Sequence, residues 1–265
     1  MDLNITWYVL LGVLLVGYVV LDGFDLGVGM LHLFAKNEDE RKVNLAAIGP
    51  FWDGNEVWLL TFGGAVFAAF PPVYATVSSS FYLAVMLLLF ALIFRAVALE
   101  FRHQLDGARW RRFWDWTFAI ASLLVAVLLG VAAGNVLRGL PIDAEGAVKL
   151  PFIALLNPHA LLIGLFSVAL CVMQGAAFLT LRTEGDLQQR MARWTVAGWI
   201  ILVVLGASAT AATFFVSPFL LQELTAKPPF WVFAVSLPAA IVYLPVAAHR
   251  RRAGHTFAAS TVTIG

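Results

Sequence analysis

Two short stretches of the sequence place carboxylates inside long apolar segments. The first, DGFDLGVGML, contains Asp22 and Asp25, and the second, GPFWDGNEVWLL, contains Asp53 and Glu56. Ionisable side chains at membrane depth are costly, and they are usually paired and functional. Acids that share a site of low dielectric cannot all be ionised at once, so some of them hold a proton and others do not. Such mixed protonation suits a proton relay, in which each site accepts and then releases a proton.

The composition indicates that these segments lie in a membrane. Of the 265 residues 61% are hydrophobic and 12% are charged, whereas a soluble domain is about half apolar and a quarter charged. We therefore expect one all-α integral-membrane domain over residues 1–265. The net charge of +1 argues against a nucleic-acid-binding surface. The single cysteine, Cys171, excludes an internal disulfide and an iron–sulfur cluster held by thiolates of this chain alone.

Seven apolar runs are long enough to cross a bilayer as helices, because about 20 helical residues span the hydrocarbon core. The charge run KNEDERK after the first run is interpreted as a solvated turn. The segment HRRRAGHTFAASTVTIG after the last run is interpreted as the start of an eighth span. The seven predicted helices lie near residues 7–34, 45–69, 78–101, 114–136, 158–181, 194–217 and 229–248.

The basic residues predict the orientation of the bundle. Most of the 17 lysines and arginines fall in the loops after the first, third, fifth and seventh predicted helices. The opposite side carries only Arg138, Lys149 and Lys227. By the positive-inside rule the arginine-rich loops are cytoplasmic and the N-terminus lies outside. No Lys or Arg precedes Lys36, so we expect the first apolar segment to remain in the mature protein.

This topology brings the acids to matched depths. The helical rise places Asp25 and Asp53 about 12–13 Å above the inner ends of the first two helices. Asp22 and Glu56 lie one turn deeper, so we expect two rungs of carboxylates facing each other across the helical hairpin. Arg95 in the third helix reaches the level of the lower rung and supplies a counter-ion. For any single acid, the alternative is a buried ion pair that only fixes the register of the helices.

We therefore predict a proton path of six residues with four further residues around it. Glu100 lies near the inner mouth of the path. The surrounding residues would contact a partner subunit or shape the environment of a cofactor. The path residues are Asp25, Asp53, Asp22, Glu56, Arg95 and Glu100. The surrounding residues are Trp52, Asn55, Trp58 and Gln174.

Glycines and histidines complete the sequence-based predictions. Gly23 and Gly27 form a small-xxx-small pair, which permits close contact between membrane helices. A phosphate loop is excluded because no strand precedes these glycines and no Walker lysine follows them. We expect no haem or metal ligand on this chain, because its histidines lie at helix ends or in loops. These are His32, His103, His159, His249 and His255.

The two acidic stretches together resemble subunit II of the cytochrome bd quinol oxidases. Further similarity follows in order within residues 17–186, in GGAVFAAFPPVYA, FRAVALEFR, RWRRFWDW, LLNPHALL and QGAAFLTLRTEG. The resemblance implies a respiratory complex of the bacterial cytoplasmic (inner) membrane that oxidises quinol and reduces dioxygen to water. It implies a partner, subunit I, which holds haems b and d and the quinol site. Subunit II would support that partner and help to deliver cytoplasmic protons to it.

The resemblance also bears on single residues and on partners. The hydrophilic path of the family maps onto Asp25 and Asp53, with Trp52, Asp22 and Arg95 beside them. No catalytic residue is expected on this chain, and the resemblance allows a structural quinone or lipid and a small accessory subunit. The family has about nine helices, so we expect this chain to lack the last one or two. The alternatives are a purely structural subunit and a proton- or cation-coupled transporter, which would also need buried acids.

Overall fold

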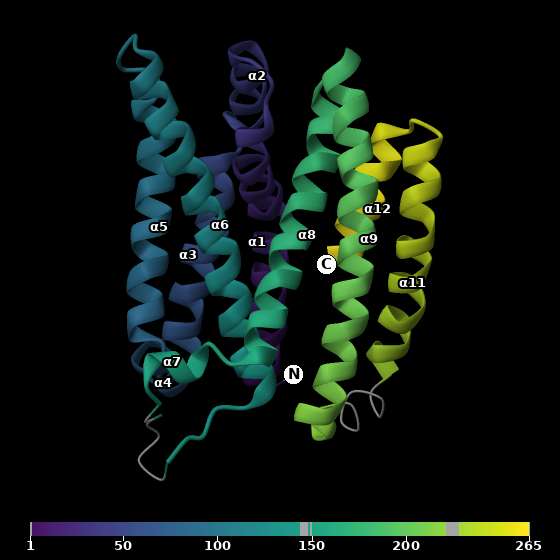
Figure 1. Ribbon diagram of the computed structural model, residues 1–265. Helices are drawn as coiled ribbons and strands as arrows, with labels where there is room; N and C mark the ends of the chain where they lie inside the picture. Colours follow the sequence, from purple (N-terminus) through teal and green to yellow (C-terminus); the bar gives the residue numbers. More distant parts are fainter. Residues whose placement is uncertain (1, 144–147, 149, 221–227, 265) are drawn as a thin grey trace.

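The computed structural model describes residues 2–143, 148, 150–220 and 228–264, and this part of the chain forms a bundle of long helices (Figure 1). Within these residues there is no strand, and Ile142 and Val148 form an isolated bridge. Five helices are long and apolar enough to cross a membrane. They are α1 (Leu3–Leu31, extended to Phe34 by the one-turn helix His32–Phe34), α5 (Tyr82–Phe101), α6 (Ala108–Arg138), α8 (Pro158–Arg182) and α9 (Gly185–Val216).

The second predicted helix is in fact two helices, so the prediction of one helix over residues 45–69 was wrong. α2 (Glu38–Ile48) ends before Gly49, and α3 (Trp52–Ala69) begins after Phe51. Pro50 lies between them. Proline has no backbone N–H to donate, and its ring clashes with the carbonyl group four residues earlier, so a helix stops at this point. Asp53 therefore lies in the first turn of a new helix rather than in the middle of a long one.

Other helix boundaries also differ from the hydropathy-based prediction. A short helix, α4 (Pro71–Ser80), precedes α5, and a single turn, α7 (Phe152–Leu155), precedes α8. α6 and α9 begin well before the predicted starts at residues 114 and 194. Their first turns are polar, and hydropathy detects only the apolar part of a helix although its backbone bonds continue beyond it. After α11 (Pro228–His249), the last segment forms a further helix, α12 (Ala253–Ile264), as the sequence predicts.

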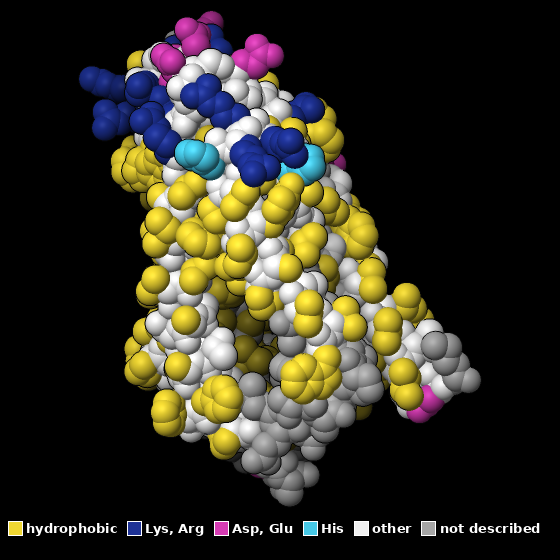
Figure 2. Space-filling model, turned by 90° about the vertical axis from the view of Figure 1, so that its right-hand side faces the viewer, with side chains coloured by type: hydrophobic (Ala, Val, Ile, Leu, Met, Phe, Trp, Pro, Cys, Tyr) yellow, Lys and Arg dark blue, Asp and Glu magenta, His cyan; other side chains and the backbone are white. Residues whose placement is uncertain are grey.

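Lysine and arginine side chains gather at one end of the bundle, and apolar side chains cover the flank below it (Figure 2). We call this the basic end; it comprises residues 32–44, 100–112, 182–193 and 249–255. Arg138 closes α6 at the opposite end, near the N-terminus of the chain (Figure 1). Lys149 and Lys227 lie outside the described residues. The charge asymmetry predicted from the loops is therefore present among the residues that the structure describes.

α1 lies at the centre of the bundle and packs against α3, α6 and α8 (Figure 1). Its contact with α8 depends on Gly27, since a Cβ atom there would fall 1.9 Å from the carbonyl oxygen of Cys171. Gly175 of α8 faces Gly27 in the same way, with 2.5 Å from a Cβ to the backbone carbon of Gly27. A Cβ on Gly23 would meet nothing within 4 Å. Of the predicted Gly23–Gly27 pair, only Gly27 is therefore required for close packing.

We expect Gly27→Ala to destabilise the protein by about 1–3 kcal/mol, because α1 and α8 must separate to admit the new methyl group. Gly23→Ala is the matched control in the same helix. It meets open space, and alanine favours a helix over glycine. Thermal unfolding of the purified protein in detergent measures both variants. Equal unfolding temperatures for the two variants would contradict this account of the glycine contact.

The charge run KNEDERK is not a turn, as the sequence suggested, but contains the start of α2. Asn37 caps the helix, and its side chain accepts a hydrogen bond of 2.9 Å from the Glu40 backbone N–H. The Glu40 carboxylate in turn accepts a bond of 2.7 Å from the Lys36 backbone N–H. This reciprocal arrangement is a form of the capping box, which satisfies the free donors of the first helical turn. Glu40 also accepts a hydrogen bond from Arg190 and so ties α2 to α9.

The Glu40–Arg190 pair predicts a pH dependence of stability. The hydrogen bond from the Arg190 guanidinium holds the pKa of the Glu40 carboxyl below its ordinary value. A carboxyl whose pKa is lower in the folded state stabilises that state above the unfolded pKa of about 4.3. This stabilisation is lost as the pH falls through the folded pKa. Glu40→Gln should therefore lower the unfolding temperature at pH 7, and the difference from wild type should shrink below about pH 4.

Asp39→Asn is the control for this pH dependence. The Asp39 side chain is 92% exposed, and its contact with Lys42 is 4.0 Å long. An exposed pair of this length contributes little to stability. A pH-independent effect of Glu40→Gln, or an equal effect of Asp39→Asn, would contradict the assignment.

Candidate proton-transfer site

Five polar side chains from three helices meet in the apolar interior, and we call them the polar cluster. α1 contributes two carboxylates, α3 contributes an amide and a carboxylate, and α5 contributes an arginine. Two of the three acids and the arginine are fully buried, although the segments around them are apolar. The members are Asp22, Asp25, Asn55, Glu56 and Arg95.

Arg95 is the centre of this cluster. Its Nη2 donates to Asp22 Oδ1 at 2.7 Å, and its Nη1 donates to Glu56 Oε1 at 2.7 Å. The side chains of Arg95 and Asp22 are 0% exposed, and that of Glu56 is 19% exposed. Charge-assisted bonds of this length are among the strongest in proteins, and a planar guanidinium can serve two acceptors at once. Arg95 thus joins α1, α3 and α5. It is a counter-ion as predicted, but it pairs with the deeper acids Asp22 and Glu56, whereas the sequence analysis placed it level with Asp25 and Asp53.

Asp25 is bound by an amide instead of a cation. Asn55 Nδ2 donates to Asp25 Oδ2 at 2.7 Å and lies 3.4 Å from the carbonyl oxygen of Leu21. Asp25 is fully buried and Asn55 is 8% exposed. A neutral amide can hold either the ionised or the protonated form of a carboxyl group, because it offers a donor and an acceptor.

The charges of the polar cluster do not balance if every acid is ionised. Asp22, Asp25 and Glu56 would carry three negative charges against the single positive charge of Arg95. In a medium of low dielectric an unpaired charge is expensive, so a proton on one of these acids relieves the excess. Two carboxylate oxygens, Asp22 Oδ2 and Asp25 Oδ1, have no hydrogen-bond partner among the described residues. The same is true of the buried Tyr18 hydroxyl. A carboxylate oxygen without a hydrogen-bond partner can accept a proton without breaking an existing bond.

Asp53 does not face Asp25, so the predicted ladder of four carboxylates was wrong in its lower rung. Asp53 is exposed on the surface of the described structure, and Asn55 takes the place opposite Asp25. The physical reason is the break at Pro50, which starts α3 at Trp52 and turns the first residues of the helix outward. In this first turn the Asp53 carboxylate is favoured by the partial positive charge of the helix N-terminus.

The other predicted residues fall into three environments. Glu100 is exposed at the basic end. Trp52 is half-buried against the main apolar core, and the ring of Trp58 packs on Gly17 of α1. Gln174 is fully buried but lies apart from these contacts, since it bonds to Ser260 at 2.5 Å and Thr261 at 3.2 Å.

Gln174 therefore ties α8 to α12 in the structure. Its place in the surroundings of a proton path stays a prediction.

A second buried polar network was missed by the sequence analysis. At the basic end, Asp115 of α6 accepts a bond of 2.5 Å from Arg102 Nε and lies 2.7 Å from His32 Nε2. Arg102 also donates to Glu38 of α2 at 2.8 Å. Asp115 is preceded by six aromatic or basic residues in RWRRFWDW, which looks like an ordinary interfacial segment. Only the tertiary structure shows that this network connects α1, α2, α5 and α6.

The histidines of the chain lie apart from the polar cluster. Three histidines are already held by hydrogen bonds, His32 to Asp115, His159 to Thr213 and His255 to Tyr243. The other two, at positions 103 and 249, are exposed at the basic end. No three His, Cys, Asp or Glu side chains are placed to hold a metal ion within the described part of the chain.

The fold and this site define a multi-pass membrane protein with a buried carboxylate–arginine cluster. A family model described as cytochrome bd terminal oxidase subunit II matches residues 3–265, and the chain belongs to that family. This confirms the resemblance noted in the sequence. It does not support the alternative of a transporter.

Individual relatives agree with this assignment. The chain is 45% identical over 207 residues to the cytochrome bd-I ubiquinol oxidase subunit 2 of Escherichia coli K12, which covers 76% of this chain and 55% of the relative. It is 43% identical over 214 residues to the cytochrome bd ubiquinol oxidase subunit 2 of Bacillus subtilis 168, covering 80% and 63%. The chain thus spans little more than half the length of these relatives.

A solved structure has the same fold. It is the bd oxidase from Geobacillus thermodenitrificans, with a TM-score of 0.75, 19% identity, and coverage of 99% of this chain and 81% of the matched chain. At this identity the likeness concerns the fold alone.

Proposed function

We propose that this chain is the second subunit of a quinol-oxidising, dioxygen-reducing complex of the bacterial cytoplasmic membrane. The observation that carries the proposal is family membership along residues 3–265, together with relatives that are named as ubiquinol oxidase subunits. The partner is a haem-bearing subunit I, which holds haems b and d and reacts with quinol and oxygen. A small accessory subunit and membrane lipids complete the proposed set of partners.

Within this complex the polar cluster is proposed to carry protons towards the oxygen-reducing site. Protons enter near Glu100 at the basic end and pass first to Asp25. Asp22 and Glu56 then bind and release them farther from the basic end. Support comes from the burial of Asp22 and Asp25, from their free oxygen atoms, and from an excess of acids over the one arginine. Arg95 fixes the relative positions of Asp22 and Glu56 by donating a hydrogen bond to each of them.

Asp53 is proposed to lie where the path leaves this chain. It is exposed, although α3 is otherwise largely apolar, and it lies one turn from Glu56 on the same helix. A carboxylate facing lipid would be costly, so a partner surface is the natural cover for Asp53. Trp52 and Trp58 would border the same surface.

The orientation and the number of spans are part of the proposal. With the basic end in the cytoplasm the N-terminus lies outside, in keeping with the positive-inside rule. α3 and α11 would add two spans to the five long apolar helices, which gives seven, and α12 would begin an eighth. The single domain over residues 1–265 and a bound structural quinone or lipid also remain proposals.

Purification tests the proposed function most directly. The chain is tagged in its bacterial host and extracted in mild detergent, and a visible absorption spectrum is recorded together with quinol-dependent oxygen consumption. We expect a copurifying chain that brings haem absorption and oxidase activity. A stable, folded protein that is obtained without any haem-bearing partner would overturn the proposal. A complex that keeps full activity after Asp25→Asn would favour the purely structural role.

A further inference from the structure

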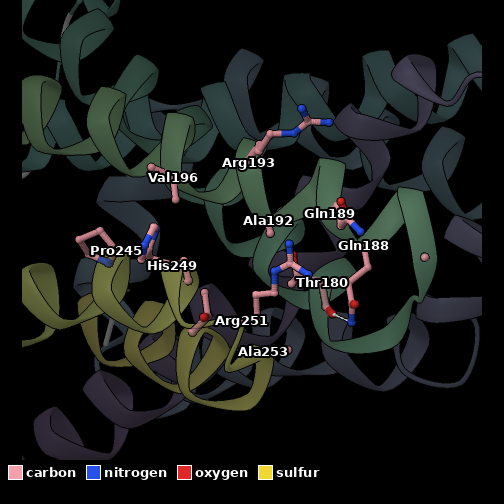
Figure 3. Close-up of a pocket in the computed structure, with 13 residues that line it drawn as sticks. Thr180, Gln188, Gln189, Ala192, Arg193, Val196, Pro245, His249, Arg251 and Ala253 are labelled. Atoms are coloured by element: carbon pink, nitrogen blue, oxygen red, sulfur yellow. Dashed lines mark hydrogen bonds between the residues drawn. The ribbon is translucent and has the colours of Figure 1, made fainter.

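A cavity of about 720 Å³ lies at the basic end, away from the polar cluster. The end of α8, the start of α9, the end of α11 and the start of α12 enclose it (Figure 3). It is open on one side. No residue of the polar cluster or of the proposed proton path lines this cavity.

The polar part of the lining is cationic. Arg193 of α9, Arg251 in the turn after α11, and His249 line the cavity together with Gln188, Gln189 and Thr180. The guanidinium of Arg193 extends away from that of Arg251 (Figure 3). No carboxylate occurs among the described residues that line it.

A second cavity at the basic end provides a contrast. That cavity, of about 480 Å³, also contains arginines, but two carboxylates line it with them. Glu38 and Asp115 each lie 3.7 Å from Arg41, and Glu38 lies 3.7 Å from Arg111. The positive charge of the larger cavity is therefore left without a protein counter-charge in its lining.

The backbone at Arg251 is held in an unusual conformation. Its φ of 53° is the only positive φ at a non-glycine residue in the described part of the chain. A left-handed residue directly after a helix is typical of a Schellman motif, which ends the helix and satisfies its last carbonyl groups. Hydrogen bonds from the N–H groups of residues 250, 251 and 252 to carbonyl groups at the end of α11 close the turn. The turn directs the guanidinium of Arg251 towards Ala192 of α9 and Thr180 of α8 (Figure 3).

The rest of the lining is apolar. Val196, Ala192, Pro245 and Ala248 form the wall that continues from the cationic part towards the apolar flank of α9 and α11. On that flank Ile200 and Val242 are more than half exposed, so they would face lipid chains. An occupant of this cavity must therefore present an anionic group to the arginines and an apolar part to the helices.

We propose that this cavity binds the phosphate headgroup of an anionic phospholipid, with its acyl chains along α9 and α11. Arg193 and Arg251 bind the phosphate, and Gln188 and Gln189 offer donors to the headgroup oxygens. Basic pockets between membrane helices at one membrane face are suited to such lipids. A free phosphate ion would satisfy the arginines but would leave the apolar wall uncovered, whereas a phospholipid would cover both parts of the lining.

The test measures lipid bound to the full chain, purified together with its partner where a complex assembles. Native mass spectrometry counts phosphatidylglycerol after equilibration with mixed micelles that contain phosphatidylglycerol or phosphatidylcholine. We expect selective binding of phosphatidylglycerol. Arg193→Gln and Arg251→Gln should each weaken it by roughly fivefold. Arg109→Gln and Arg252→Gln remove the same charge at exposed positions outside the cavity and should leave binding unchanged.

Further arms of the experiment distinguish the outcomes. If Arg109→Gln and Arg252→Gln weaken phosphatidylglycerol binding as much as the cavity variants do, the lipid is attracted by the overall positive charge of the basic end. That result would overturn the proposal. Inorganic phosphate or glycerol phosphate that competes at the same concentration as phosphatidylglycerol would indicate a free-anion site and would also overturn it. Arg251→Gly suits the positive φ and protects the fold, so it must still lose binding. Unchanged binding in Arg251→Gly would contradict the role of this side chain.

Discussion

Replacing Arg95 by glutamine is expected to destabilise the protein by about 3–5 kcal/mol, because it leaves two buried acids without their shared counter-ion. Asp22 and Glu56 each lose a hydrogen bond of 2.7 Å to the guanidinium. The uncharged amide cannot compensate them, and the acids must then take up protons to remain buried. Thermal unfolding in detergent and the yield of folded protein measure this loss.

Two further variants distinguish the loss of the Arg95 charge from the loss of its side-chain packing as the cause of the lower stability. Arg109→Gln removes an exposed arginine at the basic end and should change stability by less than about 0.5 kcal/mol. Adding Asp22→Asn and Glu56→Gln to Arg95→Gln removes the uncompensated charges and should restore part of the stability. If the triple variant is no more stable than Arg95→Gln alone, the loss does not come from the unpaired acids.

Asp25→Asn is expected to slow quinol-driven oxygen reduction by roughly 100-fold, the usual contribution of a proton-transferring group, if the chain acts as proposed. An asparagine at this position keeps the shape of the side chain and can still accept the hydrogen bond from Asn55 Nδ2. It cannot bind and release a proton at neutral pH. Assembly and unfolding temperature should therefore stay close to those of the wild type while turnover falls.

Asp106→Asn is the control for Asp25→Asn, because the Asp106 side chain is fully exposed and makes only a contact of 3.7 Å with Arg111. Its turnover should equal that of the wild type. Asp25→Glu retains a titratable group and should recover part of the activity. Wild-type oxygen consumption by a fully assembled Asp25→Asn complex would eliminate Asp25 from the path and favour a structural role for this chain.

Much of the site could be predicted because membrane helices make depth a simple function of residue number. Asp22 and Glu56 lie at matching depths, as their positions along α1 and α3 require. Arg95 reaches them because its side chain extends beyond the level expected from its position along α5. Azimuth around a helix is harder to predict than depth. The restart of α3 after Pro50 decides which side chain faces Asp25, and it turns Asp53 outward and Asn55 inward.

The glycine contact and the Asp115–Arg102 network also depend on contacts between segments that are distant in the sequence. A Cβ atom on Gly27 would clash with the α8 backbone, whereas one on Gly23 would meet nothing within 4 Å. This difference depends on where α8 approaches α1, which the spacing of the glycines in the sequence does not reveal. The Asp115–Arg102 network depends on contacts between four segments at the basic end. Local sequence there resembles any charged membrane boundary, so its burial could not be predicted.

The two hydrogen bonds of Arg95, to Asp22 and Glu56, have a consequence for how the chain enters the membrane during synthesis. Asp22 and Glu56 leave the ribosome before Arg95 does, because α1 and α3 precede α5. Until α5 arrives, both acids must cross the bilayer interior without a cation, so they enter most easily in their neutral form. The arrival of the third helix then completes the ion pairs and fixes the hairpin.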